Sequence, residues 1–269
     1  MNEVVFELQD AHYSYLNKFT ALNGISMNIR RGEKIVLLGA NGSGKSTLLQ
    51  MLDGLIFPSR GNILFFGDEL KESVFNNADF TRNFRSKVGF VFQNPEIQLF
   101  CPTVREDIVF GPLQFSVPKE VVKKRLAQLA ESFDIGHLLE RSPHQLSVGE
   151  KRKVAIASTL ASDPDILILD EPTAGLDPLT TRLIVDIILS AHEQGKTVIS
   201  ATQDLHLVSE IADTVYILSQ DKRIVRFGAT DTILSDQPLL KENNLVHIHR
   251  HAHKGDLHIH PHEHLEHHT

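Results

Sequence analysis

Short apolar runs of strand length alternate with segments of helical periodicity from Val4 to about Gly228. Four of the runs are rich in β-branched residues and bounded by charged residues or glycine, as is typical of strands buried on both faces of a sheet. These runs are Lys34–Gly39, Lys87–Phe92, Asp165–Asp170 and Thr197–Thr202. The alternation predicts an α/β fold with a mainly parallel sheet.

An insert of helical periodicity separates the second and third of these strands, and we expect it to form a helical subdomain over about residues 95–162. Its apolar residues recur every three or four positions at Val122, Leu126, Leu129 and Phe133. Earlier in the insert, Thr103 and Glu106 have the spacing of a capping box. This spacing predicts a short helix that Thr103 caps and that ends at Phe110, before Gly111-Pro112.

The pattern weakens beyond Gly228, which gives three units along the chain. Residues 4–228 form the predicted core domain, and residues 229–245 are expected to form a small C-terminal helical cap. Residues 246–269 are rich in histidine and have no apolar periodicity, which is typical of a disordered tail.

The composition is that of an ordinary soluble protein of 269 residues, with 41% hydrophobic and 23% charged residues. A net charge of −7 argues against a broad basic surface, and so against nucleic acid as a partner. The single cysteine, Cys101, allows no intrachain disulfide, and neither an apolar leader nor an apolar run of about 20 residues is present. We therefore expect a protein on the cytosolic side, with at most peripheral membrane contact.

One phosphate-binding motif follows the first buried strand and precedes a predicted helix over Ser46–Leu55. Residues 39–47 match the pattern G-x-x-x-x-G-K-[ST], in which backbone N–H groups at a helix N-terminus surround phosphates. Lys45 is expected to reach the β- and γ-phosphates, and the Ser46 hydroxyl to ligate Mg²⁺. The predicted nucleotide-binding residues of this loop are Gly39, Asn41, Gly42, Ser43, Gly44, Lys45, Ser46 and Thr47.

The third strand ends in two acidic residues that would complete a phosphoryl-transfer site. Asp170 is expected to hold Mg²⁺, and Glu171 to orient or deprotonate the attacking water. A solvated turn at a strand end is the structural alternative, which the preceding phosphate-binding loop makes less favourable.

Together these motifs resemble those of the ATP-binding subunits of ABC transporters, over roughly Val5 to Ala229. The resemblance implies a P-loop NTPase core with a small antiparallel β-subdomain and a helical subdomain. The segment Leu146–Lys153 resembles the ABC signature. In that family the signature binds the γ-phosphate held by the opposite subunit, which implies a dimer and assigns nucleotide contacts to Ser147 and Gly149.

Three further positions match the family pattern. Asp177, in Ala174-Gly-Leu-Asp177, matches the loop that crosses the dimer interface, and Gln93 occupies the Q-loop position that contacts Mg²⁺ and couples to the membrane partner. Tyr15 matches the aromatic residue that stacks on adenine. Tyr13 is the alternative for this role, and both tyrosines could instead only pack a small β-subdomain.

The sequence departs from the family at three positions. Val148 replaces a glycine, and we expect it to restrict φ and narrow the approach of the phosphate. Glu150 stands where glutamine is common. Gln203 stands where the family has its switch histidine, and it cannot carry a proton near neutral pH, so we expect slower hydrolysis. The glutamine is either a natural variant or a change introduced to trap bound ATP.

The segments Asn94–Phe100 and Thr103–Pro112 are similar to those of ATPases of energy-coupling-factor (ECF) importers. The resemblance implies a transmembrane coupling subunit that docks after the Q-loop, and a substrate-binding membrane subunit. Exposed apolar residues such as Phe100 would lie in that interface. The alternative is that Leu99 and Phe100 pack the helical subdomain.

Histidines alternate along the tail, which favours an extended or disordered segment able to bind Ni²⁺, Co²⁺, Zn²⁺ or Cu²⁺. The candidate ligands are His247, His249, His251, His253, His258, His260, His262 and His264. A purification-tag remnant and non-specific adsorption of metal are the alternatives. The scattered histidines at positions 12, 137, 144, 192 and 206 indicate no site.

The sequence thus predicts the ATP- and Mg²⁺-dependent ATPase of an ECF importer for cobalt or nickel. We expect it to work as a homodimer, or with a related ATPase, on the cytoplasmic face of the membrane. One alternative is the ATPase of a vitamin importer with an incidental tail. Others are a weakly hydrolysing regulatory or metal-buffering protein and a soluble ABC ATPase of repair or translation.

Overall fold

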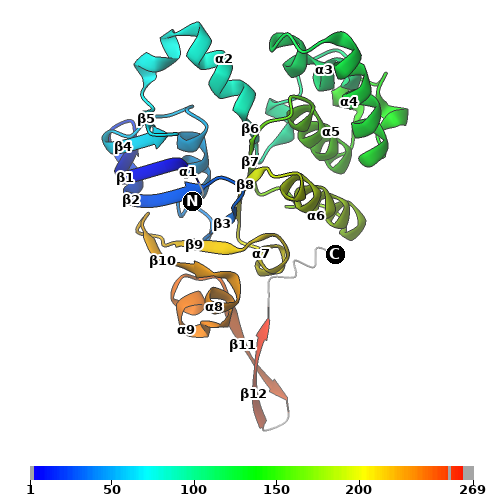
Figure 1. The fold of residues 1–269 in the computed structure, drawn as a ribbon. Helices are drawn as coiled ribbons and strands as arrows, with labels where there is room; N and C mark the ends of the chain where they lie inside the picture. The colour runs from blue at the N-terminus through cyan, green and yellow to red at the C-terminus, as the bar shows by residue number, and fades with distance from the viewer. Residues whose placement is uncertain (1–2, 254–255, 263–269) are drawn as a thin grey trace.

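The structure is a computed structural model that describes residues 3–253 and 256–262, with the backbone alone from residue 247 onward. A six-stranded sheet lies at its centre, and five of the strands pair in parallel (Figure 1). Along the sheet the order is β10 (Ile224–Ala229), β9 (Thr214–Leu218), β3 (Lys34–Leu38), β8 (Thr197–Thr202), β7 (Ile166–Asp170) and β6 (Val88–Val91). The four strands predicted from the sequence are the neighbours β3, β8, β7 and β6, which confirms the predicted mainly parallel sheet.

Both faces of this sheet are buried, because successive residues of a strand point to opposite sides. In β3, Ile35 and Leu37 pack with helix α1 (Lys45–Leu52) and with apolar residues of the first 30 positions, whereas Val36 and Leu38 pack with the helices of the other face. Each of these four side chains is at most 1% exposed. Burial on both sides explains why the central strands are continuous apolar runs rather than alternating patterns.

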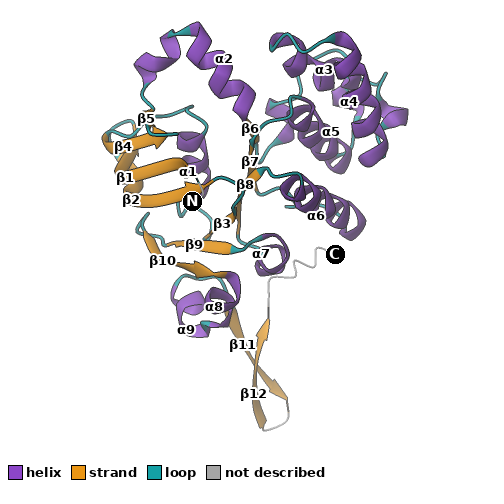
Figure 2. Ribbon diagram, in the orientation of Figure 1, coloured by secondary structure: helices purple, strands orange, loops and turns teal. Residues whose placement is uncertain are grey.

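A second, antiparallel sheet of four strands lies on one side of the central sheet (Figure 2). Its strands, in spatial order, are β2 (Phe19–Arg30), β1 (Val4–Tyr15), β4 (Arg60–Phe65) and β5 (Asp68–Glu69). The helices of this half are α1 (Lys45–Leu52), the 3-10 helix η1 (Glu72–Asn76) and α2 (Ala78–Lys87). This sheet is the small antiparallel β-subdomain that the family resemblance implied.

The helical insert forms a group of its own beside the edge strand β6 (Figure 1). Its elements are η2 (Pro95–Ile97), α3 (Val104–Gln114), α4 (Lys119–Ser132), η3 (Gly136–Leu138), η4 (Pro143–Gln145) and α5 (Val148–Ala161). Thr103 caps α3 in a complete capping box with Glu106, as predicted. The predicted end at Phe110 is wrong, because α3 continues through Pro112 to Gln114. Gly111 lacks the Cβ that normally clashes with a following proline ring, so the helix can pass through this position.

The remaining helices follow the strands of the central sheet. They are α6 (Pro178–Glu193), α7 (Leu205–Ile211), α8 (Thr230–Ser235) and α9 (Gln237–Glu242), the last two within the segment expected to form a small cap. Among the described helices, none combines the length and the apolar character that a membrane crossing requires.

The histidine-rich tail contains two strands where the sequence pattern indicated disorder. β11 (His247–His253) and β12 (Asp256–His262) pair antiparallel, and the Cα partners include His247 with His262, His249 with His260 and His251 with His258. The backbone of these segments is extended, which is one of the two forms, extended or disordered, that the alternation of histidines favours. Strict alternation of residue types is compatible with strands, whose side-chain period is two.

Candidate active site

A cavity of about 290 Å³ lies at the carboxyl ends of the central strands β3 and β7. Residues 41–47 of the glycine-rich loop line it, together with Tyr15, Gln93, Glu171 and Lys222. Ligands of open α/β sheets bind at this end of the strands, where the loops carry the variable chemistry. The fold therefore gathers in one place the phosphate-binding loop, an aromatic residue, an amide and an acid that are far apart in the sequence.

The last glycine of the glycine-rich loop, Gly44, has a backbone conformation that favours glycine. Gly44 is the N-cap of α1 with φ +103°, and a Cβ on it would lie 2.4 Å from the Ala21 carbonyl oxygen. No side chain caps the N-terminus of α1, so its first backbone N–H groups stay available to an anion. This geometry fits a phosphate group.

Lys45 is the buried cation of the site, with 5% exposure. Its Nζ donates a hydrogen bond to the Gly39 carbonyl oxygen at 2.6 Å and lies 3.4 Å from Glu171 Oε1. The ammonium group is thus held between the glycine-rich loop and the end of β7.

Two buried carboxyl groups face this lysine. Asp170 is 4% exposed and Glu171 is 9% exposed, and burial raises the pKa of both, whereas the charge of Lys45 lowers it. A hydrogen bond with Ser46 also lowers the pKa of Asp170. Asp170 Oδ1 and Ser43 Oγ are buried without hydrogen-bond partners, and Glu171 Oε1 has only its ion pair with Lys45. Buried oxygens without partners fit a site built for an external cation and a polar ligand.

Strand β8 fixes the position of Glu171. The backbone of Glu171 has φ +46°, and its N–H donates to the Ala201 carbonyl oxygen at 2.9 Å. Thr202 Oγ1 donates to Glu171 Oε2 at 3.1 Å, which also lowers the pKa of the carboxyl group. The sequence motifs gave no indication of Thr202, because only the pairing of β7 with β8 brings it to Glu171.

The two candidate aromatic residues occupy different places. Tyr15 is 40% exposed, and its hydroxyl lies 3.3 Å from Thr47 Oγ1 and 3.3 Å from Gln50 Oε1. Tyr13 packs against the apolar core, with its ring edge-on to Tyr15 at 5.0 Å between centroids. Tyr15 lines the cavity and Tyr13 does not, so the position of Tyr15 suits stacking on a base.

The two predicted glutamines are also separated. Gln93 is exposed in the loop after β6 and lines the cavity. Gln203 is exposed directly after β8 and does not line the cavity. In this structure Gln203 is therefore not among the residues that surround the space above Lys45.

The segment that resembles the ABC signature lies at the start of helix α5 and does not line this cavity. Ser147 caps α5 in a capping box with Glu150, whose carboxylate accepts from the Ser147 N–H at 2.7 Å. Val148 is the first helical residue, is 60% exposed and is not among the residues with positive φ. Val148 therefore adopts a helical backbone without strain, and the expected narrowing of the phosphate approach stays a prediction.

Asp177 and Gly149 lie together at the N-termini of α5 and α6. Asp177 Oδ1 accepts from the Leu179 and Thr180 N–H groups at 3.0 Å each, and Asp177 Oδ2 accepts from the Thr180 hydroxyl at 2.6 Å. These hydrogen bonds lower the pKa of Asp177. A Cβ on Gly149 would lie 3.6 Å from Thr180 Oγ1, an ordinary contact. None of Ser147, Gly149 and Asp177 lines the cavity.

Sequence reasoning missed Lys222, which reaches the cavity from the turn between β9 and β10. Lys222 Nζ donates to the Gly42 carbonyl oxygen, and the neighbouring Gln220 donates to the Asn41 carbonyl oxygen at 3.1 Å. A polar turn about 180 residues after the glycine-rich loop carries no local signal for this contact. A motif search could not have found it.

The proposed tail ligands cannot be placed as side chains. The backbone of seven of them lies in β11 and β12, and His264 lies outside the described residues. Elsewhere in the part that the structure describes, no three His, Cys, Asp or Glu side chains gather as a metal-binding group.

Known proteins are similar to this chain in both sequence and fold. Residues 22–174 match the family described as ABC transporter. The nickel import ATP-binding protein NikO of Rhodobacter capsulatus is 46% identical over 244 residues, which are 90% of this chain and 95% of that protein. An energy-coupling factor transporter ATP-binding protein of Methanothermobacter thermautotrophicus is 41% identical over 90% of this chain and 76% of its own length.

Among solved structures, cbiO1 of Clostridium perfringens, described as part of the ABC transporter complex cbiONQ, has a TM-score of 0.75 and 35% identity. The match covers 90% of this chain and 95% of that chain. A dimeric ATP-binding cassette in a post-hydrolysis state with ADP and Pi has a TM-score of 0.74 and 26% identity, over 84% of this chain and 98% of its own.

Proposed function

Since the chain belongs to the ATP-binding subunits of ABC transporters, we propose that it drives an ECF-type importer of a transition-metal ion, nickel or cobalt. The observation that carries this proposal is the near full-length similarity to a nickel import ATP-binding protein. The chain would act as a dimer on the cytoplasmic face of the membrane, with a coupling subunit and a substrate-binding subunit in the membrane.

The buried site suits Mg²⁺ together with a triphosphate. Ser46 and Asp170 would hold the ion through oxygen atoms, the ligands that Mg²⁺ prefers, and Gln93 also lines the cavity. When bound, Mg²⁺ neutralises charge on the phosphate oxygens. Lys45 supplies the second positive charge from within the chain.

Glu171 is the group best placed to accept a proton from the attacking water. Its carboxylate is buried, directed by Thr202 and held near Lys45. Positioned general bases of this kind contribute about 10²- to 10⁴-fold to the rate. Gln203 would contribute only as a hydrogen-bond donor, which slows turnover relative to a histidine.

A second subunit would complete the site. Ser147 and Gly149 lie at the N-terminus of α5, and Asp177 lies beside them, on a surface outside the chain's own cavity. We propose that this surface covers the triphosphate held by the other subunit, a homologous or identical chain. Since no contact among the residues that the structure describes requires glycine at position 149, close approach of a nucleotide is the reason we assign to it.

Exposed apolar residues after the Q-loop would form the membrane interface. Phe100 is 65% exposed and contacts Phe110 edge-on at 5.0 Å between centroids, whereas Leu99 is buried in the core. The Asp107 carboxylate accepts the Phe100 N–H at 3.1 Å and so holds the loop that presents this ring. An exposed aromatic pair with a fixed loop fits a groove for the coupling helices of a transmembrane subunit.

The membrane interface has a matched control within the chain. We expect Phe100→Asp to abolish co-purification with the transmembrane subunit, whereas Phe227→Asp should leave it unchanged. Phe227 is 64% exposed, as Phe100 is 65% exposed, but it lies on the edge strand β10. Equal loss of the complex in both variants would contradict this assignment.

The tail would bind the transported metal or buffer its concentration. The backbone register of β11 and β12 pairs histidine with histidine at three positions. Neutral imidazole is a common ligand of Ni²⁺, Co²⁺, Zn²⁺ and Cu²⁺. We expect removal of residues 247–269 to abolish Ni²⁺ binding by the purified protein and to reduce metal uptake in cells.

One experiment tests the whole proposal. The chain is expressed with its membrane partners, and ATP-dependent uptake of radioactive Ni²⁺ and Co²⁺ is compared for wild type, Glu171→Gln and Glu120→Gln, the last an exposed residue of α4. Only Glu171→Gln should lose uptake and hydrolysis while retaining ATP binding. Hydrolysis stimulated by a vitamin and not by metal would instead favour a vitamin importer. ATP binding without turnover in the complex would favour a regulatory protein.

A further inference from the structure

Arg152 of α5 is a buried arginine that contacts the backbone of the Q-loop. Its Nη1 donates to the Phe92 carbonyl oxygen at 2.8 Å and its Nη2 donates to the Gln93 carbonyl oxygen at 2.6 Å. The residue is 2% exposed, and its Nε has no hydrogen-bond partner. Burying a cation without a directly paired carboxylate is costly, so this arrangement calls for an explanation beyond packing.

The charge environment of Arg152 is that of the active site. Burial lowers the pKa of its guanidinium, and the charges of Asp170 and Glu171 raise it. The same arginine therefore interacts electrostatically with the two acids of the site and donates hydrogen bonds to the loop that carries Gln93.

Two further side chains fasten the same loop to the same helix. Gln98 accepts from the Phe92 N–H at 3.3 Å and donates to the Ala155 carbonyl oxygen of α5 at 3.1 Å. Lys151, the residue before Arg152, forms an ion pair with Glu96 at 2.5 Å. The segment from residue 92 to residue 98 thus contacts α5 at three places, and it should move together with that helix.

The two ends of this connection serve different nucleotides under the proposed dimer. Gln93 lines the chain's own cavity, whereas Ser147 at the start of α5 lies outside it. Arg152 lies five residues after Ser147, about 7.5 Å along the helix axis. A planar guanidinium can bind two neighbouring carbonyl groups at once, which a lysine ammonium cannot do in the same fixed geometry.

We propose that Arg152 is a positioning residue that holds the Gln93 backbone to α5, so that nucleotide in one cavity sets the position of Ser147 at the cavity of the partner subunit. The inference rests on the proposed dimeric site. It predicts that Arg152 transmits occupancy between the two sites rather than contributing to the affinity of one site.

The test measures ATP hydrolysis of the intact membrane complex as a function of ATP concentration. For the wild type we expect a Hill coefficient above one, with two sites setting the upper limit. Arg152→Lys should lower kcat by about tenfold, a loss of ~1.4 kcal/mol in the transition state. It should also bring the Hill coefficient to one, while equilibrium binding of an ATP analogue to the isolated chain stays within about twofold.

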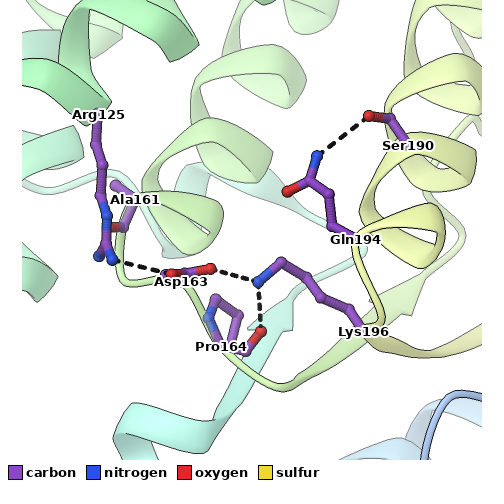
Figure 3. Close-up of polar contacts among 7 residues, drawn as sticks. All are labelled: Arg125, Ala161, Asp163, Pro164, Ser190, Gln194 and Lys196. Carbon is purple, nitrogen blue, oxygen red and sulfur yellow. Dashed lines mark hydrogen bonds and ion pairs between the residues drawn. The ribbon is translucent and has the colours of Figure 1, made fainter.

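Arg125→Gln is the matched control (Figure 3). Arg125 of α4 donates to the Ala161 carbonyl oxygen at 3.0 Å and pairs with Asp163, which also binds Lys196. These contacts also connect the helical insert to the central sheet, but they do not involve the Q-loop. This variant should keep the Hill coefficient of the wild type, even if its stability falls.

A second variant covers the case in which Arg152→Lys does not fold. Glu96→Gln removes the exposed ion pair with Lys151 without opening the core, and it should lower the Hill coefficient partially. Wild-type cooperativity in Glu96→Gln and in any folded Arg152→Lys protein overturns the inference, as does a wild-type Hill coefficient of one. Absence of all hydrolysis by the wild-type complex contradicts the proposed function itself, and the inference with it.

Discussion

The Thr202 hydroxyl donates a hydrogen bond to the Glu171 carboxylate at 3.1 Å. Thr202 is the last residue of β8, and Glu171 directly follows the neighbouring strand β7. Thr202 is 1% exposed, so water cannot replace this contact readily. The hydrogen bond stabilises the ionised form of a carboxyl group whose pKa burial raises.

Thr202→Val is expected to move the acid limb of the kcat–pH profile to higher pH. If Glu171 accepts the proton of the attacking water, as proposed, activity falls as the pH drops through its pKa, and loss of the hydrogen bond raises that pKa further. The measurement is ATP hydrolysis across pH by wild type, Thr202→Val and Thr202→Ser. The serine variant retains the donor and should follow the wild-type profile. An unchanged acid limb in Thr202→Val would show that Glu171 does not set it.

Gly149→Ala should lower ATP hydrolysis by about tenfold or more, which corresponds to ~1.4 kcal/mol in the transition state, without destabilising the fold. A Cβ at this helical position meets only ordinary contacts within the chain, and alanine favours a helix over glycine.

Gly44→Ala, in contrast, should clearly lower the unfolding temperature. Gly44 has φ +103°, and the Cβ of an alanine there would overlap the Ala21 carbonyl oxygen. Thermal unfolding and ATPase assays of both variants distinguish a loss of activity from a loss of stability. Full activity of Gly149→Ala would argue against a nucleotide at the N-terminus of α5.

Lys222→Ala should raise the KM for ATP by about tenfold, the equivalent of ~1.4 kcal/mol, with a smaller effect on kcat. Lys222 brings a positive charge to the wall of the cavity and contacts the Gly42 carbonyl oxygen. Arg223→Ala, at the next position of the same turn, is the control and should keep the wild-type KM. Equal KM values for wild type and Lys222→Ala would limit the lysine to a structural role.

If residue 203 reaches the γ-phosphate in the proposed dimer, Gln203→His should raise steady-state ATP hydrolysis several-fold, because a histidine can carry a proton or a positive charge at neutral pH. Gln203 is exposed at the end of β8, so the substitution does not disturb the core. Side-by-side assays of the two proteins provide the measurement. Activity equal to or below that of the wild type would mean that glutamine at this position does not limit turnover.

Local motifs were enough to predict four of the six strands of the central sheet and the position of the glycine-rich loop between β3 and α1. The four predicted strands and the capping box at Thr103 depend on the order of residues within short windows, where hydrophobic period and capping chemistry act directly. The end of α3 was predicted wrongly from the same kind of local signal. A proline such as Pro112 normally ends a helix, but the preceding residue, Gly111, has no side chain to clash with the ring.

The sequence by itself determined which chemistry the chain carries: a lysine and a serine after a glycine-rich loop, and two acids at the end of a strand. Only the tertiary structure decided which distant groups control that chemistry. Thr202 directs Glu171, Lys222 reaches Gly42, and Arg152 holds Gln93. These contacts join residues 31 to 180 positions apart, and strand order and helix packing, rather than any local pattern, set the distance between them.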